Sequence, residues 1–356
     1  MLGRRFLASA RREGTAPLLE RHLRRRPDLV PAAVLAELRG IRLAAAARDL
    51  RARGIMRPLL ETAFFAGLKV GISKGFHWAE RLYDEPGLRP YLDVDVFVRP
   101  AEWRSFLEIL RRTGFRPDGT RDFDSVPGLR APAWTFSPVF RKDGLAVEIH
   151  PNPFGLQSPS PADEDFWRSL RPVSLAGTTA YVPAWPQEFC YAAIHAQQHS
   201  YGRLSWLVDM AEMAGLSEWN WDTVAGLARR AGIEASLEHG LRIVSRCWPG
   251  AIPEPGRRLI PDGGWARRTA RFFWPEEAAA ARRPIPEAPY YMPTLLALTR
   301  RGRLGPKVRT LGRILCPPRD WIRSQMPGAG PLARTGYAVG RLARPWIYLV
   351  RRRIGG

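Results

Sequence analysis

The chain has 356 residues, of which 45% are hydrophobic, and carries a formal net charge of +21. This length and apolar content allow one large or two ordinary folded domains and argue against a chain that is disordered by composition. The positive charge is almost all arginine, so it permits phosphate ligands without by itself indicating nucleic-acid binding; lysine occurs only at Lys69, Lys74, Lys142 and Lys307.

The sequence indicates neither a secretory signal nor a membrane-spanning segment. Its first residues carry charge but lack the apolar stretch of a signal peptide, and no run of about 18 apolar residues occurs. The three cysteines are odd in number and far apart, which argues against a disulfide framework or a cysteine-rich zinc site. We therefore expect a cytoplasmic protein without a transmembrane segment.

Hydrophobic spacing divides the chain into three expected parts. Residues 1–65 predict a helical lead-in, because alanine, leucine and arginine dominate residues 31–61 and apolar positions recur every three or four residues. Residues 66–185 alternate short β-rich and helical stretches, and residues 186–356 predict a helical C-terminal domain with a basic tail. The expected fold class is α+β, with a sheet-containing core between N-terminal and C-terminal helical regions.

The first half of the core predicts a strand, a helix, a second strand and a second helix. Residues 67–73 form a short apolar run typical of a buried strand, and residues 74–83 follow with a helical pattern. Residues 91–98 are again rich in β-forming residues. Pro100 then opens a stretch whose apolar residues recur at helical spacing.

The second half of the core predicts a hairpin and a final strand. Residues 134–140 and 145–150 are β-rich and flank Asp143-Gly144, a pair that readily supplies the positive φ angles of a tight turn. Residues 178–182 predict the last strand. The pattern then becomes helical, over residues 188–199, 203–216, 221–247 and, at the C-terminus, 334–353.

Asp93 and Asp95 are the first candidates for catalytic residues and metal ligands. Successive side chains of a strand alternate between its faces, so these carboxylates point the same way while Val94 and Val96 point into the core. Two adjacent like charges are costly unless cations neutralise them, and paired Mg²⁺ ions do so in phosphoryl-transfer sites. The alternative is a strand end with two solvated aspartates.

Glu148 is the third candidate carboxylate, for catalysis and metal binding. It lies between Val147 and Ile149 in an apolar strand, and His150 shares its face. If this strand lies beside the strand of Asp93, Glu148 completes a triad that can bind a metal and orient an acceptor hydroxyl. The alternative is an ordinary outward-facing residue.

Ser73, Lys74 and Gly75 are candidates for nucleotide binding. They stand where a strand turns into a helix, so the glycine permits close approach of a phosphate, the helix N-terminus attracts its charge and Lys74 reaches it. Arg89, just before the Asp93 strand, could hold a second phosphate. The alternative for Arg89 is a solvated surface arginine.

Further residues could support the site without contacting the reacting atoms. They are His150, His199, Arg203 and Asp209. His195 and His199 have the spacing of zinc ligands on a helix, but Ala196 stands where zinc hydrolases carry a glutamate. We therefore expect His195 to be a packed helix residue and His199 to cap or brace the core, facing the active-site cleft. For Asp209 and Arg203 we expect an ion pair with each other rather than a catalytic dyad.

Together these segments resemble an uncharacterised nucleotidyltransferase family of the DNA polymerase beta-like superfamily. The resemblance rests on Ser73-Lys74-Gly75, residues 82–89, Leu92-Asp93-Val94-Asp95 and Val147-Glu148-Ile149-His150. It continues in His199, residues 203–209, residues 317–320, Tyr337 and Arg341. Other branches of the superfamily carry Gly-Ser or Gly-Gly before the aspartates, where this chain has Ser73-Lys74-Gly75.

The resemblance implies a polymerase beta-like core with a mixed sheet over residues 66–185. It also implies two Mg²⁺ ions, or Mn²⁺ in their place, on Asp93 and Asp95, with Glu148 as the third carboxylate. A nucleoside monophosphate would move from a nucleoside triphosphate such as ATP to an acceptor hydroxyl, releasing pyrophosphate. Family members often accompany bacterial gene sets for polysaccharide or modified-peptide production, which favours a protein, peptide, sugar or small-molecule acceptor over a nucleic acid.

Two other functions remain open from the sequence. One is a non-catalytic module that keeps the fold and binds nucleotide or nucleic acid. The other is a membrane-surface role for the basic C-terminal helix, whose alternative is a helix docked on the protein itself.

Overall fold

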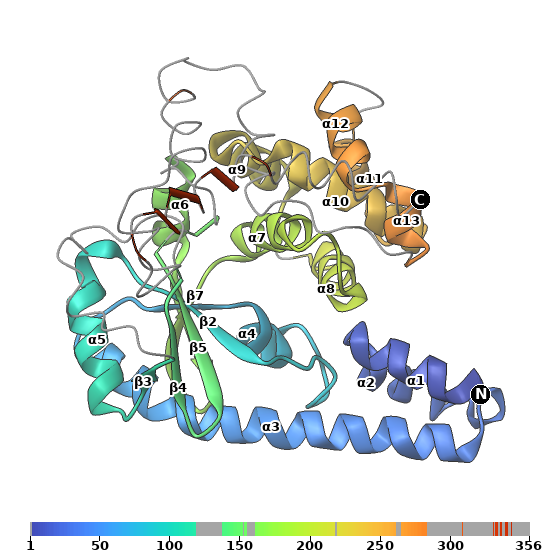
Figure 1. The fold of residues 1–356 in the computed structure, drawn as a ribbon, viewed down its shortest axis with the longest axis horizontal. Helices are drawn as coiled ribbons and strands as arrows, with labels where there is room; N and C mark the ends of the chain where they lie inside the picture. The colour runs from blue at the N-terminus through green and yellow to red at the C-terminus, as the bar shows by residue number, and fades with distance from the viewer. Residues whose placement is uncertain are drawn as a thin grey trace.

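The computed structural model describes residues 2–118, 137–151, 153–154, 161–217, 219–260 and 265–282, with residues 308, 330, 332–333, 335–336, 339–340 and 343. A seven-stranded mixed sheet stands between helices on its two sides (Figure 1). The expected α+β class is therefore consistent with the fold. None of the described helices is long and apolar enough to span a bilayer.

The sheet has the strand order β3-β4-β5-β2-β1-β7-β6. Its central strand β2 runs parallel to β5 and antiparallel to β1, and β1 runs parallel to β7. The outer pairs β3–β4, β4–β5 and β6–β7 are antiparallel. The strands are β1 (Gly71–Ser73), β2 (Asp93–Phe97), β3 (Arg116–Pro117), β4 (Val139–Lys142), β5 (Leu145–His150), β6 (Arg171–Leu175) and β7 (Thr178–Val182).

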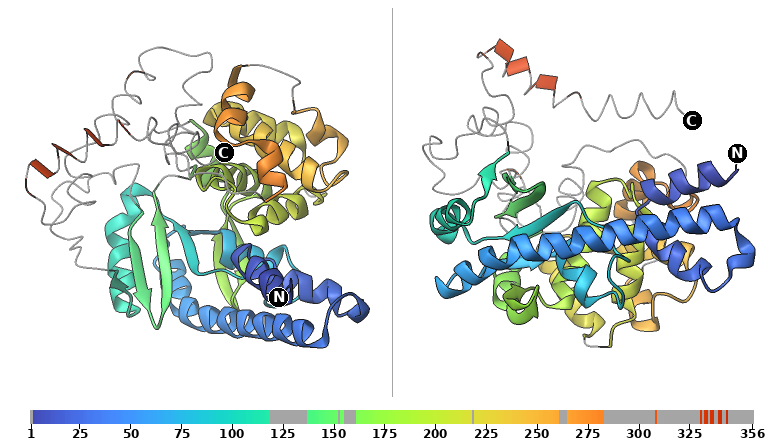
Figure 2. Two further views of the ribbon diagram at one scale, coloured as in Figure 1. Left: turned by 45° about the vertical axis from the view of Figure 1, so that its right-hand side comes forward. Right: turned by 90° about the horizontal axis from the view of Figure 1, so that it is seen from below.

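One side of the sheet is covered by the long helix α3 (Ala32–Phe65) and by α5 (Trp103–Arg112). Figure 2 shows α3 as one continuous rod against the sheet. Its apolar residues Met56 and Leu60 belong to the same buried core as Val94 and Val96 of β2. The alternation of β2 therefore buries its valines on this side and directs its aspartates to the other.

The opposite side is covered by a helical bundle that begins with α7 (Trp185–Gln198). A second core joins Phe97 of β2 to Tyr191 and Ile194 of α7 and to the helices behind them. The bundle and the helix before it comprise α6 (Pro161–Ser169), α8 (Leu204–Ala214), α9 (Trp221–Ala231), α10 (Glu234–Cys247), α11 (Glu254–Arg257), α12 (Trp265–Phe273) and α13 (Glu276–Ala280).

The chain begins with α1 (Leu2–Arg12) and α2 (Ala16–Leu23), which pack on α3. Glu13, just after α1, accepts the backbone N–H of Leu204 on its Oε2 at 3.0 Å, and its carbonyl accepts the N–H of Ser205 at 3.1 Å. Arg282 donates to the same carboxylate at 2.6 Å. The beginning of the chain thus satisfies the free N–H groups at the start of α8.

Most expected elements of the core are present. The strands at 145–150 and 178–182 have the predicted bounds, and β2 lies within residues 91–98. The predicted turn at Asp143-Gly144 has φ angles of 47° and 82°, as a tight hairpin requires. A short 3-10 turn, η2 (Pro100–Glu102), precedes α5.

Several details differ from the sequence prediction. The strand expected at 67–73 begins only at Gly71, and that expected at 134–140 begins at Val139, with residues 134–136 outside the described part. The helix expected at 221–247 is interrupted, because Gly232 ends α9 in the left-handed conformation at φ 71°.

Some elements of the fold were not predicted, and some predicted segments lie outside the described residues. Strand β6 was not predicted, because Pro172 obscures its pattern, but the strand lies at the sheet edge, where proline is tolerated. Helix α6 was likewise not among the predicted elements. Residues 317–320, Tyr337, Arg341 and most of 334–353 lie outside the described residues. The boundaries at 65/66 and 185/186 remain predictions.

Candidate functional site

The sheet register places three polar residues abreast on the face that α7 covers. Ser73 of β1 is the partner of Asp95 of β2, and Asp95 is the partner of Glu148 of β5. Paired residues of neighbouring strands share a face, so the side chains form one row. Ser73 and Asp95 are buried, whereas Glu148 is half-buried. The predicted neighbourhood of the two carboxylate strands is therefore present.

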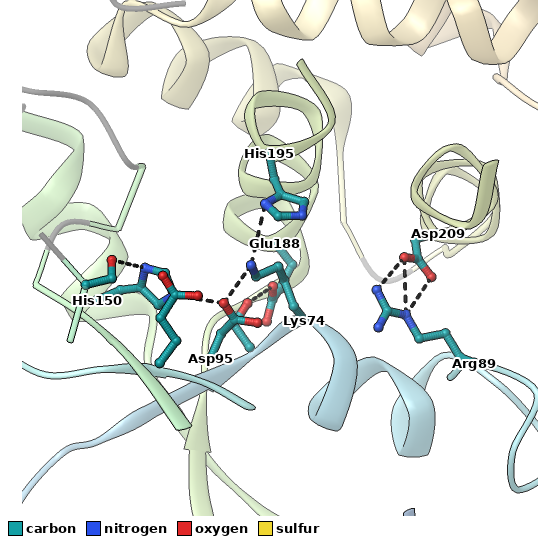
Figure 3. A network of polar contacts seen from close by, with 10 residues as sticks. Lys74, Arg89, Asp95, His150, Glu188, His195 and Asp209 are labelled. Atoms are coloured by element: carbon teal, nitrogen blue, oxygen red, sulfur yellow. Dashed lines mark hydrogen bonds and ion pairs between the residues drawn. The ribbon is translucent and has the colours of Figure 1, made fainter. Parts of the chain in front are cut away.

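Asp95 is the centre of this row (Figure 3). Its Oδ1 lies 2.6 Å from Lys74 Nζ and 2.8 Å from His150 Nε2. Burial alone would raise the pKa of Asp95, but the charge of Lys74 and the hydrogen bond from His150 outweigh it and lower the pKa below its usual range. Asp95 is therefore held as a carboxylate.

Asp93 lies one strand repeat earlier on the same face and is half-buried. Burial, the negative charge of Asp95 and, to a smaller extent, that of Glu148 raise the pKa of Asp93, while Lys74 opposes the rise. The two aspartates thus differ, because their surroundings stabilise the anionic form of Asp95 and disfavour the anionic form of Asp93. A cation between them would relieve that penalty.

Ligand atoms of Asp95, Glu148 and His150 all lie within 4.8 Å of one another. Two carboxylates and one imidazole suit a divalent cation. Mg²⁺ and Mn²⁺ both suit the carboxylate oxygens, whereas an imidazole ligand by itself favours metals such as Zn²⁺ or Fe²⁺. The imidazole of His150 is oriented by Ser137 Oγ, which lies 3.1 Å from its Nδ1. His150 is thus a candidate metal ligand itself, whereas the sequence predicted only a supporting role for it.

Lys74 reaches the site from an unusual backbone conformation. It is the first residue of α4 (Lys74–Arg81) and has a positive φ of 49°, which costs energy for a residue with a side chain. Its Nζ, besides contacting Asp95, lies 3.5 Å from His195 Nδ1 and 5.2 Å from the ring centre of Tyr191. Lys74 thus combines a strained backbone with an ammonium group held by an ion pair, and such strain is typical of a functional position.

Gly75 is required by close packing at the start of α4. A Cβ at this position would lie 2.5 Å from Tyr91 Cβ and 2.7 Å from Arg89 Nη1. The glycine therefore lets the first turn of the helix approach the segment before β2, which was not the reason proposed from the sequence.

Ser73 uses its hydroxyl inside the protein. Its Oγ donates to Glu188 Oε2 at 2.5 Å, and His77 Nδ1 lies 2.9 Å from Glu188 Oε1. Glu188 is fully buried in the first turn of α7. This group joins the β1–α4 turn to the bundle. Glu188 and His77 were not predicted from the sequence. Glu188 could have been, because an acidic residue inside the apolar stretch of α7 indicates a buried polar contact.

Arg89 and Asp209 form a separate buried pair (Figure 3). Arg89 Nη2 donates to Asp209 Oδ2 at 2.8 Å, and Tyr83 donates its hydroxyl to Oδ1 at 2.7 Å. The expected pair of Asp209 with Arg203 was therefore wrong, because Arg203 lies over the ring of Trp206 instead, at 6.0 Å. A guanidinium committed to Asp209 weakens the case for Arg89 as a phosphate clamp.

Two histidines, His195 of α7 and His199 at the C-terminal cap of that helix, lie beside the Lys74 end of the site. Their ring centres are 4.6 Å apart, and those of His195 and His199 lie 5.0 and 5.4 Å from Trp206. The surrounding protein and the charge of Lys74 lower the pKa of His199 to about 4 and that of His195 well below its usual value. Both rings are therefore neutral at neutral pH. Among the described residues they do not belong to a group of three metal ligands.

Comparison with protein families identifies one match. Residues 3–249 match the family described as uncharacterised nucleotidyltransferase. The matched range includes the whole sheet and helices up to α10, and thus every residue of the site above. Comparisons with curated proteins and with solved structures find no match.

Proposed function

Because the chain belongs to the uncharacterised nucleotidyltransferase family, we propose that it transfers a nucleoside monophosphate from a nucleoside triphosphate to an acceptor hydroxyl. Pyrophosphate is the leaving group, and the core is of the polymerase beta-like kind. The observation that carries the proposal is the row of Asp95 and Glu148 on neighbouring strands, with Lys74 at 2.6 Å from Asp95.

The carboxylates would hold the divalent cation, Mg²⁺ or Mn²⁺. Asp95 is buried and anionic, Glu148 is half-buried, and Asp93 lies on the same face at the start of β2. When bound, such a cation neutralises phosphate charge and polarises the phosphoryl group that is attacked. Asp93, Asp95 and Glu148 are the proposed metal-binding and catalytic residues.

Lys74 would bind the triphosphate. In the structure its ammonium group neutralises Asp95. When a cation occupies the carboxylates, that ion pair is no longer needed and the ammonium group is available for a phosphate oxygen. The buried contact of Ser73 with Glu188 fixes the strand end from which Lys74 extends, so we assign Ser73 and Gly75 to the shape of the turn.

Glu148 is the best-placed group to orient the acceptor. It is the most accessible of the row Ser73, Asp95 and Glu148, and its Oε2 lies 3.9 Å from His150 Nε2. A carboxylate there can accept the proton of an acceptor hydroxyl as its oxygen attacks the α-phosphorus. We propose a protein, peptide, sugar or small molecule as the acceptor.

The direct test uses each α-³²P-labelled nucleoside triphosphate with Mg²⁺ or Mn²⁺, alone and with a bacterial lysate as the source of acceptors. Pyrophosphate release and label transfer are followed for the wild type, Asp93→Asn and Asp95→Asn. Asp222→Asn is the matched control, because Asp222 is an exposed aspartate on α9.

We expect label transfer with the wild type and the control and its loss, by at least about 100-fold, in both site variants. Metal-dependent binding of nucleotide without transfer would favour the non-catalytic nucleotide module. Nucleic-acid binding with a steep salt dependence that ignores both substitutions would favour a nucleic-acid module instead.

A further inference from the structure

An aromatic shelf borders the Lys74 end of the site. We define it as His195 of α7 and His199 at the C-terminal cap of α7, together with Trp206 and Arg203 at the start of α8. The ring centres of the two histidines lie 4.6 Å from each other and 5.0 and 5.4 Å from that of Trp206. The guanidinium of Arg203 lies 6.0 Å from the centre of the same ring.

The shelf is continuous with the phosphate end of the proposed site. His195 Nδ1 lies 3.5 Å from Lys74 Nζ, and Lys74 Nζ lies 2.6 Å from Asp95 (Figure 3). The ring of Trp206 is therefore separated from the lysine by one imidazole. A nucleotide carries its phosphates and its base at opposite ends, so a molecule whose phosphates contact Lys74 can place its base toward Trp206.

Exposure increases along the shelf away from Asp95. Tyr191, which lies under Lys74, is buried, His195 and Trp206 are partly exposed, and His199 and Arg203 are exposed. Phe189 and Phe166, by contrast, are fully buried and make packing contacts inside the core. Partly exposed aromatic rings beside two cations suit a flat ligand that carries negative charge.

We propose that this shelf binds the nucleobase of the nucleoside triphosphate by stacking on Trp206 and the neighbouring histidines. The inference rests on the proposed function, because it assumes a triphosphate at Lys74. Arg203 adds a positive charge beside the stacked base. Since stacking depends on ring area, purine nucleotides bind more tightly than pyrimidine nucleotides at this shelf.

The size of the effect follows from stacking energies. Replacing one aromatic side chain that stacks on a base typically weakens binding by about 5- to 150-fold. Inorganic tripolyphosphate has the phosphates of a nucleotide but no base, so its affinity does not depend on the shelf. The ratio of the two affinities therefore isolates the contribution of the base.

The experiment measures binding to the full chain by isothermal titration calorimetry in the presence of Mn²⁺. The ligands are tripolyphosphate and the α,β-methylene analogues of ATP and CTP, which cannot release pyrophosphate. The variants are Trp206→Leu and Trp206→Phe. The matched control is Trp248→Leu, because Trp248 is also partly exposed and packs on the same bundle core.

We expect Trp206→Leu to bind the ATP analogue about 5- to 150-fold more weakly than the wild type, with unchanged affinity for tripolyphosphate. Trp206→Phe keeps part of the affinity, and Trp248→Leu keeps all of it. Equal binding of the ATP analogue by wild type and Trp206→Leu would overturn the inference and leave the proposed function intact.

Two further outcomes count against the inference. A loss of tripolyphosphate and nucleotide affinity in parallel would mean that Trp206 supports the phosphate site or the fold and not the base. A wild type that binds neither ligand would overturn the proposed function as well. Binding of the CTP analogue more tightly than the ATP analogue would refute stacking as the basis of selection.

Discussion

The buried pair of Arg89 and Asp209 leads to a quantitative prediction about stability. Asp209 is fully buried and receives hydrogen bonds from Arg89, at 2.8 Å, and from the hydroxyl of Tyr83, at 2.7 Å. Substitution Asp209→Ala removes the buried carboxylate that pairs with the guanidinium and accepts the hydroxyl proton of Tyr83. Breaking a buried ion pair by removing one partner costs about 3–5 kcal/mol, and we expect a loss of this size in the free energy of unfolding.

The assay is urea-induced unfolding followed by tryptophan fluorescence, with the midpoint and slope compared between variants. Glu108→Ala is the matched control, because Glu108 also pairs with an arginine, Arg112, at 3.0 Å but at the surface. An exposed pair of this kind contributes about 0.3–0.5 kcal/mol. A small loss in the control and a large one in Asp209→Ala would show that burial gives the inner pair its effect.

The double variant Arg89→Met with Asp209→Leu makes the test sharper. Apolar residues that replace both partners leave no unpaired charge, so the loss should be smaller than the sum of the two single losses by at least ~0.5 kcal/mol. A loss below about 1 kcal/mol for Asp209→Ala, or additive losses, would refute the reasoning. The same variants also test Arg89 as a phosphate clamp, since that role predicts weaker tripolyphosphate binding in a stably folded Arg89→Met protein.

Three further predictions concern the site itself. Lys74→Gly should lower the free energy of unfolding by about 2–4 kcal/mol in urea denaturation, because losing the ammonium partner of the buried Asp95 carboxylate costs about 3–5 kcal/mol and relief of the positive φ returns only about 1 kcal/mol. The same substitution should abolish triphosphate binding in calorimetry, and unchanged stability would argue against a stabilising ion pair. Asp93→Asn should stabilise the metal-free protein at neutral pH. Burial and the charge of Asp95 raise the pKa of Asp93, so the wild type loses folding stability as the pH rises through that pKa, and the asparagine variant does not. This gain should vanish when pH falls below the pKa of an unfolded aspartate, and a pH-independent gain in thermal-shift measurements would contradict it. Gly75→Ala should cost at least about 1–3 kcal/mol in urea unfolding, because its Cβ would lie 2.5 Å from Tyr91 Cβ.

Local patterns predicted the parts of the site that lie within one strand or one turn. Alternation on β2 predicts that Asp93 and Asp95 share a face, and the Asp143-Gly144 turn pairs β4 with β5 as expected. The resemblance to the uncharacterised nucleotidyltransferase family is confirmed by the family match over residues 3–249, and the polymerase beta-like core remains a prediction. The roles of the individual site residues remain predictions.

Contacts between distant segments could not be predicted in the same way. Glu188 lies 115 residues after Ser73 and bonds to it only because α7 crosses the end of β1. The partner of Asp209 was wrong because Arg203 is near in sequence, whereas Arg89 is brought near by the packing of α8 on the segment before β2. No periodicity in a single sequence encodes which arginine reaches a buried carboxylate.

The contact of Glu13 with the start of α8 has a consequence for synthesis of the chain on the ribosome. The carboxylate of Glu13 is buried, and its backbone partner Leu204 is made 191 residues later. The third partner, Arg282, follows later still. The N-terminal helices therefore form these contacts only after most of the protein has been synthesised. An expression fragment that ends before Leu204 removes two of the partners of the Glu13 carboxylate, Leu204 and Arg282. Fragments cut at the apparent domain borders should thus be poorer material for crystallisation than the longer chain.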